Sequence, residues 1–259
     1  MFIKKIKTKI VEAKGKLVVT YFLIILAMIF WGFSFIWTKM LLFSLKPISI
    51  ITLRLIISAS FLIVSGLLIK SLQKMKLSDL ALIGLLAFLE PFMYFLGETN
   101  GLNYVSATIS SVLIALIPLL SPFAAWLFYK EKLNILNFVG ILISFFGVTL
   151  VILKRDFTLN ASTEGILLMG LAVFSAIGYS VVVVKAVKRY NVFTIITYQN
   201  LIGVFFFLPL FLYFDLDHFR TVRFTSQNTL LLLALAILAS SAAFIWGGNC
   251  LPSPGPSGI

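Results

Sequence analysis

The chain is a series of long apolar runs separated by short polar segments. A helix needs about 20 mostly apolar residues to cross the roughly 30 Å hydrocarbon layer of a bilayer. Eight runs are long enough, and each one predicts a membrane-spanning helix. The predicted spans are Leu17–Thr38, Pro47–Ile69, Asp79–Asn103, Ser106–Tyr129, Leu133–Leu153, Glu164–Val184, Val192–Phe214 and Asn228–Trp246. The pattern therefore predicts an all-α polytopic membrane protein.

Composition agrees with this fold class. Hydrophobic residues make up 61% of the chain and charged residues 12%, whereas a soluble domain is about one quarter charged. Six lysines precede the first run, as in a signal peptide. That run is too long for a signal peptide, and no small-residue cleavage site follows it before Lys39. We therefore expect residues 1–16 to be a basic cytoplasmic terminus that leads into a retained first span.

The basic residues between the spans predict the orientation in the membrane. With the N-terminus in the cytoplasm, fourteen fall on the inner side, namely Lys4, Lys5, Lys7, Lys9, Lys14, Lys16, Lys70, Lys74, Lys76, Lys130, Lys132, Lys185, Lys188 and Arg189. Six fall on the outer side, namely Lys39, Lys46, Lys154, Arg155, Arg220 and Arg223. Because an excess of Lys and Arg marks the cytoplasmic side, we expect a multi-pass protein of the cell membrane with a cytoplasmic N-terminus.

The net charge of +12 does not indicate a nucleic-acid partner. Such binding needs basic residues gathered on one folded face, and here they are distributed between apolar runs. The single cysteine, Cys250, excludes an internal disulfide, and the single histidine, His218, excludes the usual ligand spacing of a zinc site. We expect no metal and no cofactor.

A short internal repeat joins the two halves of the chain. A shift of 145 positions places ISIITLRLIISA (Ile48–Ala59) over FTIITYQNLIGV (Phe193–Val204) and aligns Arg54 with Gln199. Five spans separate the two copies, and an odd number turns the second copy upside down, as in the inverted repeats of secondary transporters. Chance similarity is the alternative for so short a match.

Three stretches resemble the EamA-type permeases of the drug/metabolite transporter superfamily. They are FWGFSFIWTK (Phe30–Lys39), PISIITLRLIISA (Pro47–Ala59), and the long segment Tyr104–Ile152, in which Pro118 precedes Glu131 by thirteen residues. The resemblance implies a ten-helix fold of two inverted five-helix repeats around a central cavity. It also implies transport of amino acids, other metabolites or drugs.

The end of the chain departs from this pattern. The resemblance covers about residues 20–247, with a first five-helix repeat at 17–153 and a partial second repeat of three helices at 163–247. The last segment, 248–259, is rich in Gly, Pro and Ser, a composition that cannot span a bilayer. A truncated or frameshifted product is the favoured interpretation, and a genuine eight-span protein is the alternative.

Three ionisable residues lie inside the predicted spans, namely Arg54, Glu90 and Glu98. A charge in the membrane is costly, so such residues are candidates for function. At 1.5 Å per residue, Glu90 lies about 16 Å from the inner end of its helix, near the middle of the membrane. The functional interpretation is that the carboxylates bind a cationic or amino group, or carry a proton, with Tyr94 and Asn103 adding hydrogen bonds.

A structural interpretation competes with this one. Glu90 and Arg54 lie at similar depths, so they could form a buried ion pair that serves stability alone. Glu98 could extend to the outer surface of the membrane. We favour a Glu90 that faces a cavity. Tyr94 and Glu98 lie on the same face of the predicted helix as Glu90, and an ion pair with Arg54 alone would not need so many polar residues there.

Prolines predict bends in two spans. Pro91 cannot donate to the carbonyl of Ala87, and Pro118 and Pro122 free two carbonyls in the fourth span. A bent helix can move one half against the other, as alternating access requires. A static kink within the bundle is the alternative.

Two further patterns concern helix packing. Trp31 and Ser34 share a face of the first span with Trp37 and Thr38, and this face suits contact with a substrate or, for Trp37, with the lipid interface. Glycines at helical spacing predict close packing against a neighbouring helix. Two such pairs occur, Gly97 with Gly101 and Gly140 with Gly147.

We therefore predict a permease for small molecules that works by alternating access. The alternative is a membrane protein that does not transport, either truncated or structural. None of the GxSxG, HExxH, Walker or GxGxxG motifs occurs, so we expect no enzyme. The expected partners are a small-molecule substrate and the lipid bilayer.

Overall fold

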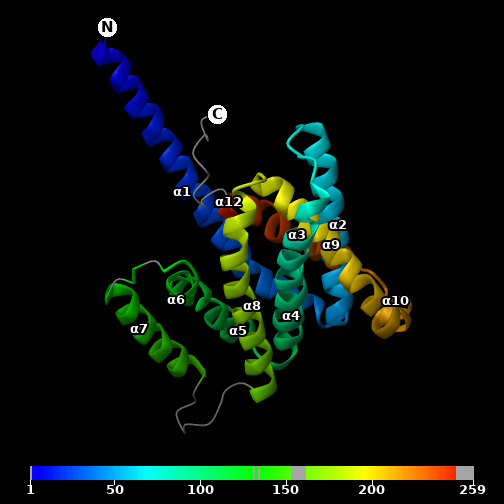
Figure 1. The fold of residues 1–259 in the computed structure, drawn as a ribbon. Coiled ribbons are helices and arrows are strands. Elements are labelled where there is room, and N and C mark those ends of the chain that lie inside the picture. The colour runs from blue at the N-terminus through cyan, green and yellow to red at the C-terminus, as the bar shows by residue number, and fades with distance from the viewer. Residues whose placement is uncertain (1, 131, 134, 153–161, 249–259) are drawn as a thin grey trace.

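The computed structural model describes residues 2–130, 132–133, 135–152 and 162–248. Every regular element in this part of the chain is helical (Figure 1). The α-helices are α1 (Phe2–Leu41), α2 (Pro47–Leu68), α3 (Leu80–Ala87), α4 (Tyr94–Tyr104), α5 (Ala107–Ile114), α6 (Ile117–Tyr129), α7 (Ile135–Ile152), α8 (Thr163–Val187), α9 (Val192–Leu210), α10 (Leu216–Thr221), α11 (Ser226–Leu233) and α12 (Ala243–Gly248). A 3₁₀ turn, η1 (Leu77–Asp79), and three π-helical segments, η2 (Phe88–Met93), η3 (Phe211–Asp215) and η4 (Ala234–Ala242), lie between them.

These helices confirm the predicted fold class. Seven stretches of described helix are long and apolar enough to cross a membrane, and a shorter apolar stretch, Phe138–Val151, lies in α7. The seven are Val18–Leu41, Pro47–Leu68, Leu77–Tyr104, Ala107–Tyr129, Thr163–Val187, Val192–Thr221 and Ser226–Gly248. The predicted fifth span, Leu133–Leu153, corresponds to this shorter stretch of α7, and the predicted seventh span continues as helix past Phe214 to Thr221. Of the predicted tail, only Gly248 lies within the described residues.

Side-chain caps set where several helices begin. Ser106, Ser162, Asn191 and Thr225 each accept a hydrogen bond from the backbone N–H three residues later, at the starts of α5, α8, α9 and α11. Such residues satisfy one of the free N–H groups at a helix N-terminus. The predicted start of the fourth span at Ser106 is therefore correct.

The third and fourth spans are interrupted at Pro91 and just before Pro118, as predicted, whereas helix α6 continues through Pro122. The third span passes through η2 at Pro91, and Glu90 there has non-helical torsion angles of φ −144° and ψ 119°. The fourth span divides between α5 and α6, with Pro118 in the first turn of α6 and Pro122 inside that helix. The π-helical segments η3 and η4 were not predicted. Pro209 lies just before η3, whereas η4 contains no proline.

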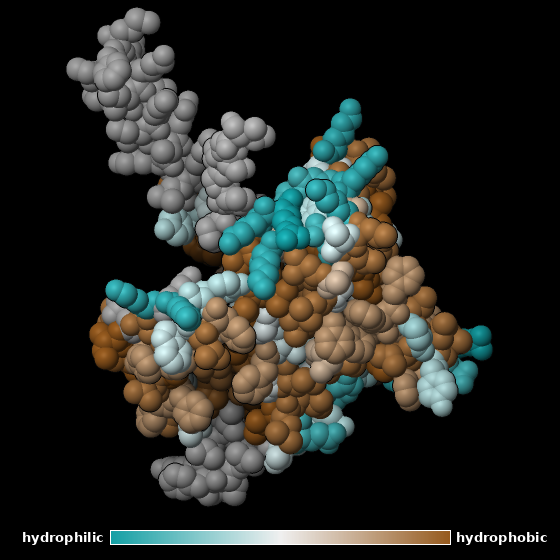
Figure 2. Space-filling view, in the orientation of Figure 1, coloured by the Kyte–Doolittle hydropathy of each residue, from teal (hydrophilic) through white to brown (hydrophobic). Residues whose placement is uncertain are grey.

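The helices form a bundle with one outlying group. Helix α2 packs along α9, α4 packs along α8, and α1 packs against α12 and η4. Helices α5, α6 and α7 lie to one side of the bundle, where α5 and α6 contact α8 (Figure 1). Figure 2 shows hydrophobic side chains over most of the visible surface, with hydrophilic ones gathered mainly near one end of the bundle. This distribution is that of a protein surrounded by lipid.

The glycine predictions divide into one success and one error. A methyl group added at Gly97 would lie 2.5 Å from the Leu168 carbonyl oxygen and 2.8 Å from the Ala172 nitrogen, so α4 and α8 meet backbone to backbone there. Close packing at this glycine is confirmed. No described atom lies within 4 Å of the equivalent point at Gly140 or Gly147. The predicted close packing of α7 through these two residues is therefore wrong.

Candidate functional site

A buried cluster of charges lies between α2 and α4. Arg54 and Glu98 are each 2% exposed, and Arg54 Nη1 lies 3.9 Å from Glu98 Oε2. The guanidinium also lies over the ring of Phe95, 4.1 Å from its centroid, which adds a cation–π attraction. Its Nε donates a hydrogen bond to Ser240 Oγ in η4. Three side chains, from α4 and η4, therefore meet around the Arg54 cation of α2.

This geometry corrects two interpretations of the sequence. Arg54 has its ion pair with Glu98, not with Glu90. Glu98 does not extend to the membrane surface, because it is buried against Arg54 instead. The distance of 3.9 Å is longer than a hydrogen bond, and Glu98 Oε2 has no hydrogen-bond partner among the described residues.

Glu90 is the second carboxylate of the cluster. It is 7% exposed, and neither of its oxygens accepts a hydrogen bond from a described residue. It lies at the non-helical residue of η2, immediately before Pro91. Pro91 packs on α9, where a methyl group added at Gly203 would overlap its ring. The break therefore places a carboxylate without a direct partner in the interior of the bundle.

The second half of the chain contributes a polar seam beside this cluster. Ser58 Oγ lies 2.8 Å from Ser241 Oγ, and Asn200 Nδ2 donates to Ser58 Oγ at 2.8 Å. Tyr179 donates its hydroxyl to Gln199 Oε1 at 3.2 Å. The sequence interpretation did not select these residues. The repeat contained a signal for one of them, because its 145-residue shift aligns Gln199 with Arg54.

Two buried threonines have hydroxyl groups without a hydrogen-bond partner among the described residues. The two atoms are Thr38 Oγ1 on α1 and Thr99 Oγ1 on α4. Buried polar atoms are nearly always paired in folded proteins, so such exceptions mark positions where a polar ligand could be received. Thr99 follows Glu98 directly in sequence.

The other predicted site residues have different surroundings. Tyr94 is partly buried and packs edge-on to Phe95, with ring centroids 5.4 Å apart. Trp31 donates its indole N–H to the Ala239 carbonyl at 3.3 Å and packs edge-on to Phe244. Ser34 is buried and donates to the Trp31 carbonyl. Asn103 is exposed near the end of α4, so the structure does not place it in the cluster.

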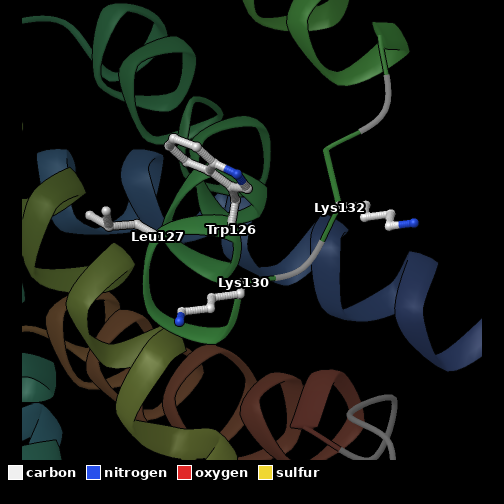
Figure 3. Close-up of a pocket in the computed structure, with 4 residues that line it drawn as sticks. All are labelled: Trp126, Leu127, Lys130 and Lys132. Carbon is white, nitrogen blue, oxygen red and sulfur yellow. The ribbon is translucent and has the colours of Figure 1, made fainter.

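A shallow pocket lies at the far end of α6. It has a volume of about 310 Å³ and is lined by Trp126, Leu127, Lys130 and Lys132 (Figure 3). Lys130 ends α6 in a left-handed conformation with φ 56°, and its N–H donates to the Trp126 carbonyl. Glu131, between the two lysines, lies outside the described residues. Nothing in the pocket connects it to the buried cluster.

Chemically, the cluster offers charges and hydrogen bonds for recognition. It combines one arginine with two carboxylates, and Ser240, which accepts from Arg54, also accepts at its carbonyl from Asn200 in the polar seam. Among the described residues, no group of three or more His, Cys, Asp or Glu side chains could hold a metal ion. The arrangement is suited to holding a polar or charged solute within the bundle.

Comparisons with known proteins agree with this architecture. The model of the EamA-like transporter family matches residues 18–153, which is just over half of the chain. A solved structure described as "Crystal structure of protein" superposes with a TM-score of 0.63 at 17% sequence identity, covering 88% of this chain and 78% of that one. This likeness shows the fold alone. A search of curated proteins found no match.

Proposed function

This chain belongs to the EamA-like transporter family, and we propose that it is a secondary transporter that moves small metabolites, amino acids or drugs across the cell membrane by alternating access. Members of this family are transporters and not enzymes. The substrate passes through the interior of the bundle, at the cluster of Arg54, Glu90 and Glu98.

The observation that carries this proposal is the Glu90 carboxylate. An ionised group deep in a membrane protein is normally paired, because leaving water without a partner costs several kcal/mol. Arg54 already has Glu98 beside it, so the cluster holds two carboxylates and one arginine. One more positive charge would balance it. A cationic or amino group of the substrate, or a proton, supplies that charge at Glu90.

The surroundings of Glu90 support a role in transport. The residue lies at a helix break, and backbone irregularity at membrane depth is tolerated where it is buried in protein or lines a cavity. Discontinuous helices near the middle of the membrane form the solute sites of many secondary transporters. Tyr94, one turn further along, and the seam of Ser58 and Asn200 provide neutral hydrogen-bonding groups.

The substitution Glu90→Gln tests this proposal. It keeps the size of the side chain and removes its charge. Because Glu90 is not the ion-pair partner of Arg54, we expect normal abundance and a monodisperse purified protein. Uptake into proteoliposomes, measured with a panel of labelled amino acids and organic amines, should fall to the level of empty liposomes.

The control is Glu164→Gln, a carboxylate of the same type in the first turn of α8. It should transport the panel at the level of the unmodified protein. Full transport by Glu90→Gln would refute the assignment of Glu90. Absence of transport by the unmodified protein, for every solute of the panel, would refute the proposed substrate classes.

A further inference from the structure

The N-termini of α2 and α9 are each held by the segment that follows the other helix. Ser49, in the first turn of α2, donates its backbone N–H and its hydroxyl to Asp215 Oδ2 at 2.8 and 2.9 Å. Asp215 ends η3, directly after α9. Lys46, which precedes α2, donates to the Phe214 carbonyl at 3.3 Å. We call the two hydrogen bonds from Ser49 to Asp215 the Asp215 tie.

The other end of the helix pair has a matching set of contacts. Asn191 precedes α9, and its side chain donates to the Ser71 carbonyl at 2.8 Å while its N–H donates to Gln73 Oε1 at 2.8 Å. The N–H of Gln73 donates to Thr194 Oγ1 at 2.9 Å. Ser71 and Gln73 follow α2. We call these contacts the Asn191 tie, and the two ties together require α2 and α9 to run antiparallel.

The two ties use equivalent positions of the internal repeat. The shift of 145 residues that aligns Arg54 with Gln199 also aligns Lys46 with Asn191 and Ser49 with Thr194. Each tie therefore joins the start of one repeat's second helix to the segment after its counterpart. The chemistry differs at the two ends. Asn191 caps α9 itself, whereas Lys46 offers no side-chain cap and Asp215 caps α2 from outside.

Further contacts strengthen the Asn191 end. Tyr190 donates its hydroxyl to Asp79 Oδ2 at 2.7 Å and accepts from the N–H of Lys76 at 3.0 Å. Arg189 pairs with Asp79 as well. The N–H of Lys76 lowers the pKa of Tyr190, but the hydrogen bond to Asp79 and burial raise it by more. The phenol therefore stays protonated and remains a donor at neutral pH.

The pair that is tied in this way carries most of the polar groups of the candidate site. Arg54 and Ser58 are on α2, and Gln199 and Asn200 are on α9. All four are buried. Sliding of one helix along the other would separate Ser58 from Asn200, so the ties set the register of the seam.

Helices α6 and α7 are attached in a different way, whereas α5 shares a buried core with α1, α4 and α8 through Ile109 and Leu113. Of the side-chain hydrogen bonds between described residues, one joins α6 or α7 to the rest of the bundle, from the Tyr129 hydroxyl to the Val181 carbonyl at 2.6 Å. Between them and α8 lies a pocket of about 240 Å³ with a wholly apolar lining that includes Leu116, Ile141 and Val173. Apolar contacts have no fixed direction, so this interface can shift without breaking hydrogen bonds.

We infer that Asp215 and Asn191 are positioning residues that keep α2 and α9 in one register throughout transport, while α6 and α7 move against α8. This inference rests on the proposed alternating access. It specifies which helices stay fixed during transport and which helices move.

Distances between spin labels test the inference without a known substrate. Three pairs of exposed positions are labelled in a Cys250→Ser background, and each is measured by dipolar EPR in lipid nanodiscs. Lys46→Cys with Phe214→Cys reports the Asp215 tie, and Lys74→Cys with Lys188→Cys reports the Asn191 tie. Phe128→Cys with Lys185→Cys reports the interface of α6 and α8.

We expect one distance at each tie and two populations at the interface of α6 and α8. Two populations at either tie would overturn the inference and leave alternating access standing. A single distance at all three pairs would overturn the movement of α6 and α7 against α8. Transport itself is tested separately by the uptake assay, and so the two failures are distinguishable.

Substitutions separate positioning from a general effect on folding. Asp215→Ala should broaden the distance at the Lys46/Phe214 pair and leave the Lys74/Lys188 pair unchanged. Asp215→Asn keeps an oxygen acceptor and should restore the single distance. The control, Asp217→Ala, removes an exposed carboxylate two residues away and should change neither pair.

If Asp215→Ala does not yield folded protein, Ser49→Ala provides the same test. It removes only the hydroxyl donor and should broaden the same pair to a smaller extent. An unchanged distance at the Lys46/Phe214 pair in folded Asp215→Ala, or in folded Ser49→Ala where that variant is used, would show that Asp215 does not set the register.

Discussion

At the scale of single residues, the two intramembrane glutamates have opposite surroundings although they lie eight positions apart. Glu98 is beside the only arginine inside a predicted span, and Glu90 has no direct partner among the described residues. Replacing either one by glutamine makes the same chemical change. The consequences should differ, because only Glu98 compensates a buried cation.

Glu98→Gln should therefore destabilise the protein. It leaves Arg54 without its counter-charge, and breaking a buried ion pair by removing one partner costs about 3–5 kcal/mol. The free energy of unfolding, measured by denaturant titration in mixed micelles, should fall by an amount of this order. Glu90→Gln should change it much less.

A second substitution checks the cause of this loss. Replacing Arg54 by methionine in the Glu98→Gln background removes the stranded cation and should recover part of the stability, because apolar replacement of a buried pair is often close to neutral. Equal stability of Glu98→Gln and the unmodified protein would contradict the pairing of Glu98 with Arg54.

At the scale of helices, α4 and α8 approach each other backbone to backbone. Gly97 lets these helices meet at the backbone of Leu168 and Ala172. The contact positions α4, and therefore Glu98, against the bundle. A side chain at this position would have to push against backbone atoms, which cannot rotate away.

Gly97→Ala should therefore be destabilising by about 1–3 kcal/mol, the usual cost of overpacking a core. Thermal unfolding followed by circular dichroism would measure the change. The control is Gly84→Ala in the same span, where no described atom lies within 4 Å of the added methyl group. It should be neutral or slightly stabilising, because alanine favours a helix by up to about 1 kcal/mol over glycine. Similar melting of both variants would contradict close packing at Gly97.

At the scale of the whole molecule, the topology follows from the distribution of charge and the pairing of loops. The segment after α2 and the segment before α9 are hydrogen-bonded to each other through Gln73 and Asn191. They must therefore lie on the same side of the membrane. The excess of basic residues predicts that this side is the cytoplasm.

Cysteines introduced at Lys74 and Lys188 should therefore be inaccessible from outside the cell. In a Cys250→Ser background, an impermeant maleimide should label neither position in intact cells, and both after permeabilisation. A cysteine at Asp217, beside the opposite tie, should be labelled in intact cells. Labelling of Lys74→Cys or Lys188→Cys from outside would reverse the topology.

The sequence by itself determined the fold class, the approximate spans and two of the helix breaks. The apolar length of a segment and the missing N–H of a proline are properties of that segment alone, so they do not depend on how the rest of the chain packs. A run of about 20 apolar residues must cross the membrane wherever its neighbours lie, and Pro91 and Pro118 lack an N–H in any packing. The three ionisable residues inside spans were visible for the same reason, since a charge among apolar residues is conspicuous before folding.

Only the tertiary structure decided which partner each charge has and which helices approach closely. The sequence predicted Arg54 at a similar depth to Glu90. Arg54 nevertheless lies beside Glu98, because the rotation of each helix about its axis and the break at η2 are set by packing against other helices. Ser240 and Asn200 were not recognised, since serine and asparagine are common in spans and become notable only when brought together. Gly97 and Gly140 look alike along the chain, but only Gly97 meets the backbone of another helix. Such contacts join residues far apart in sequence, and local pattern carries no information about them.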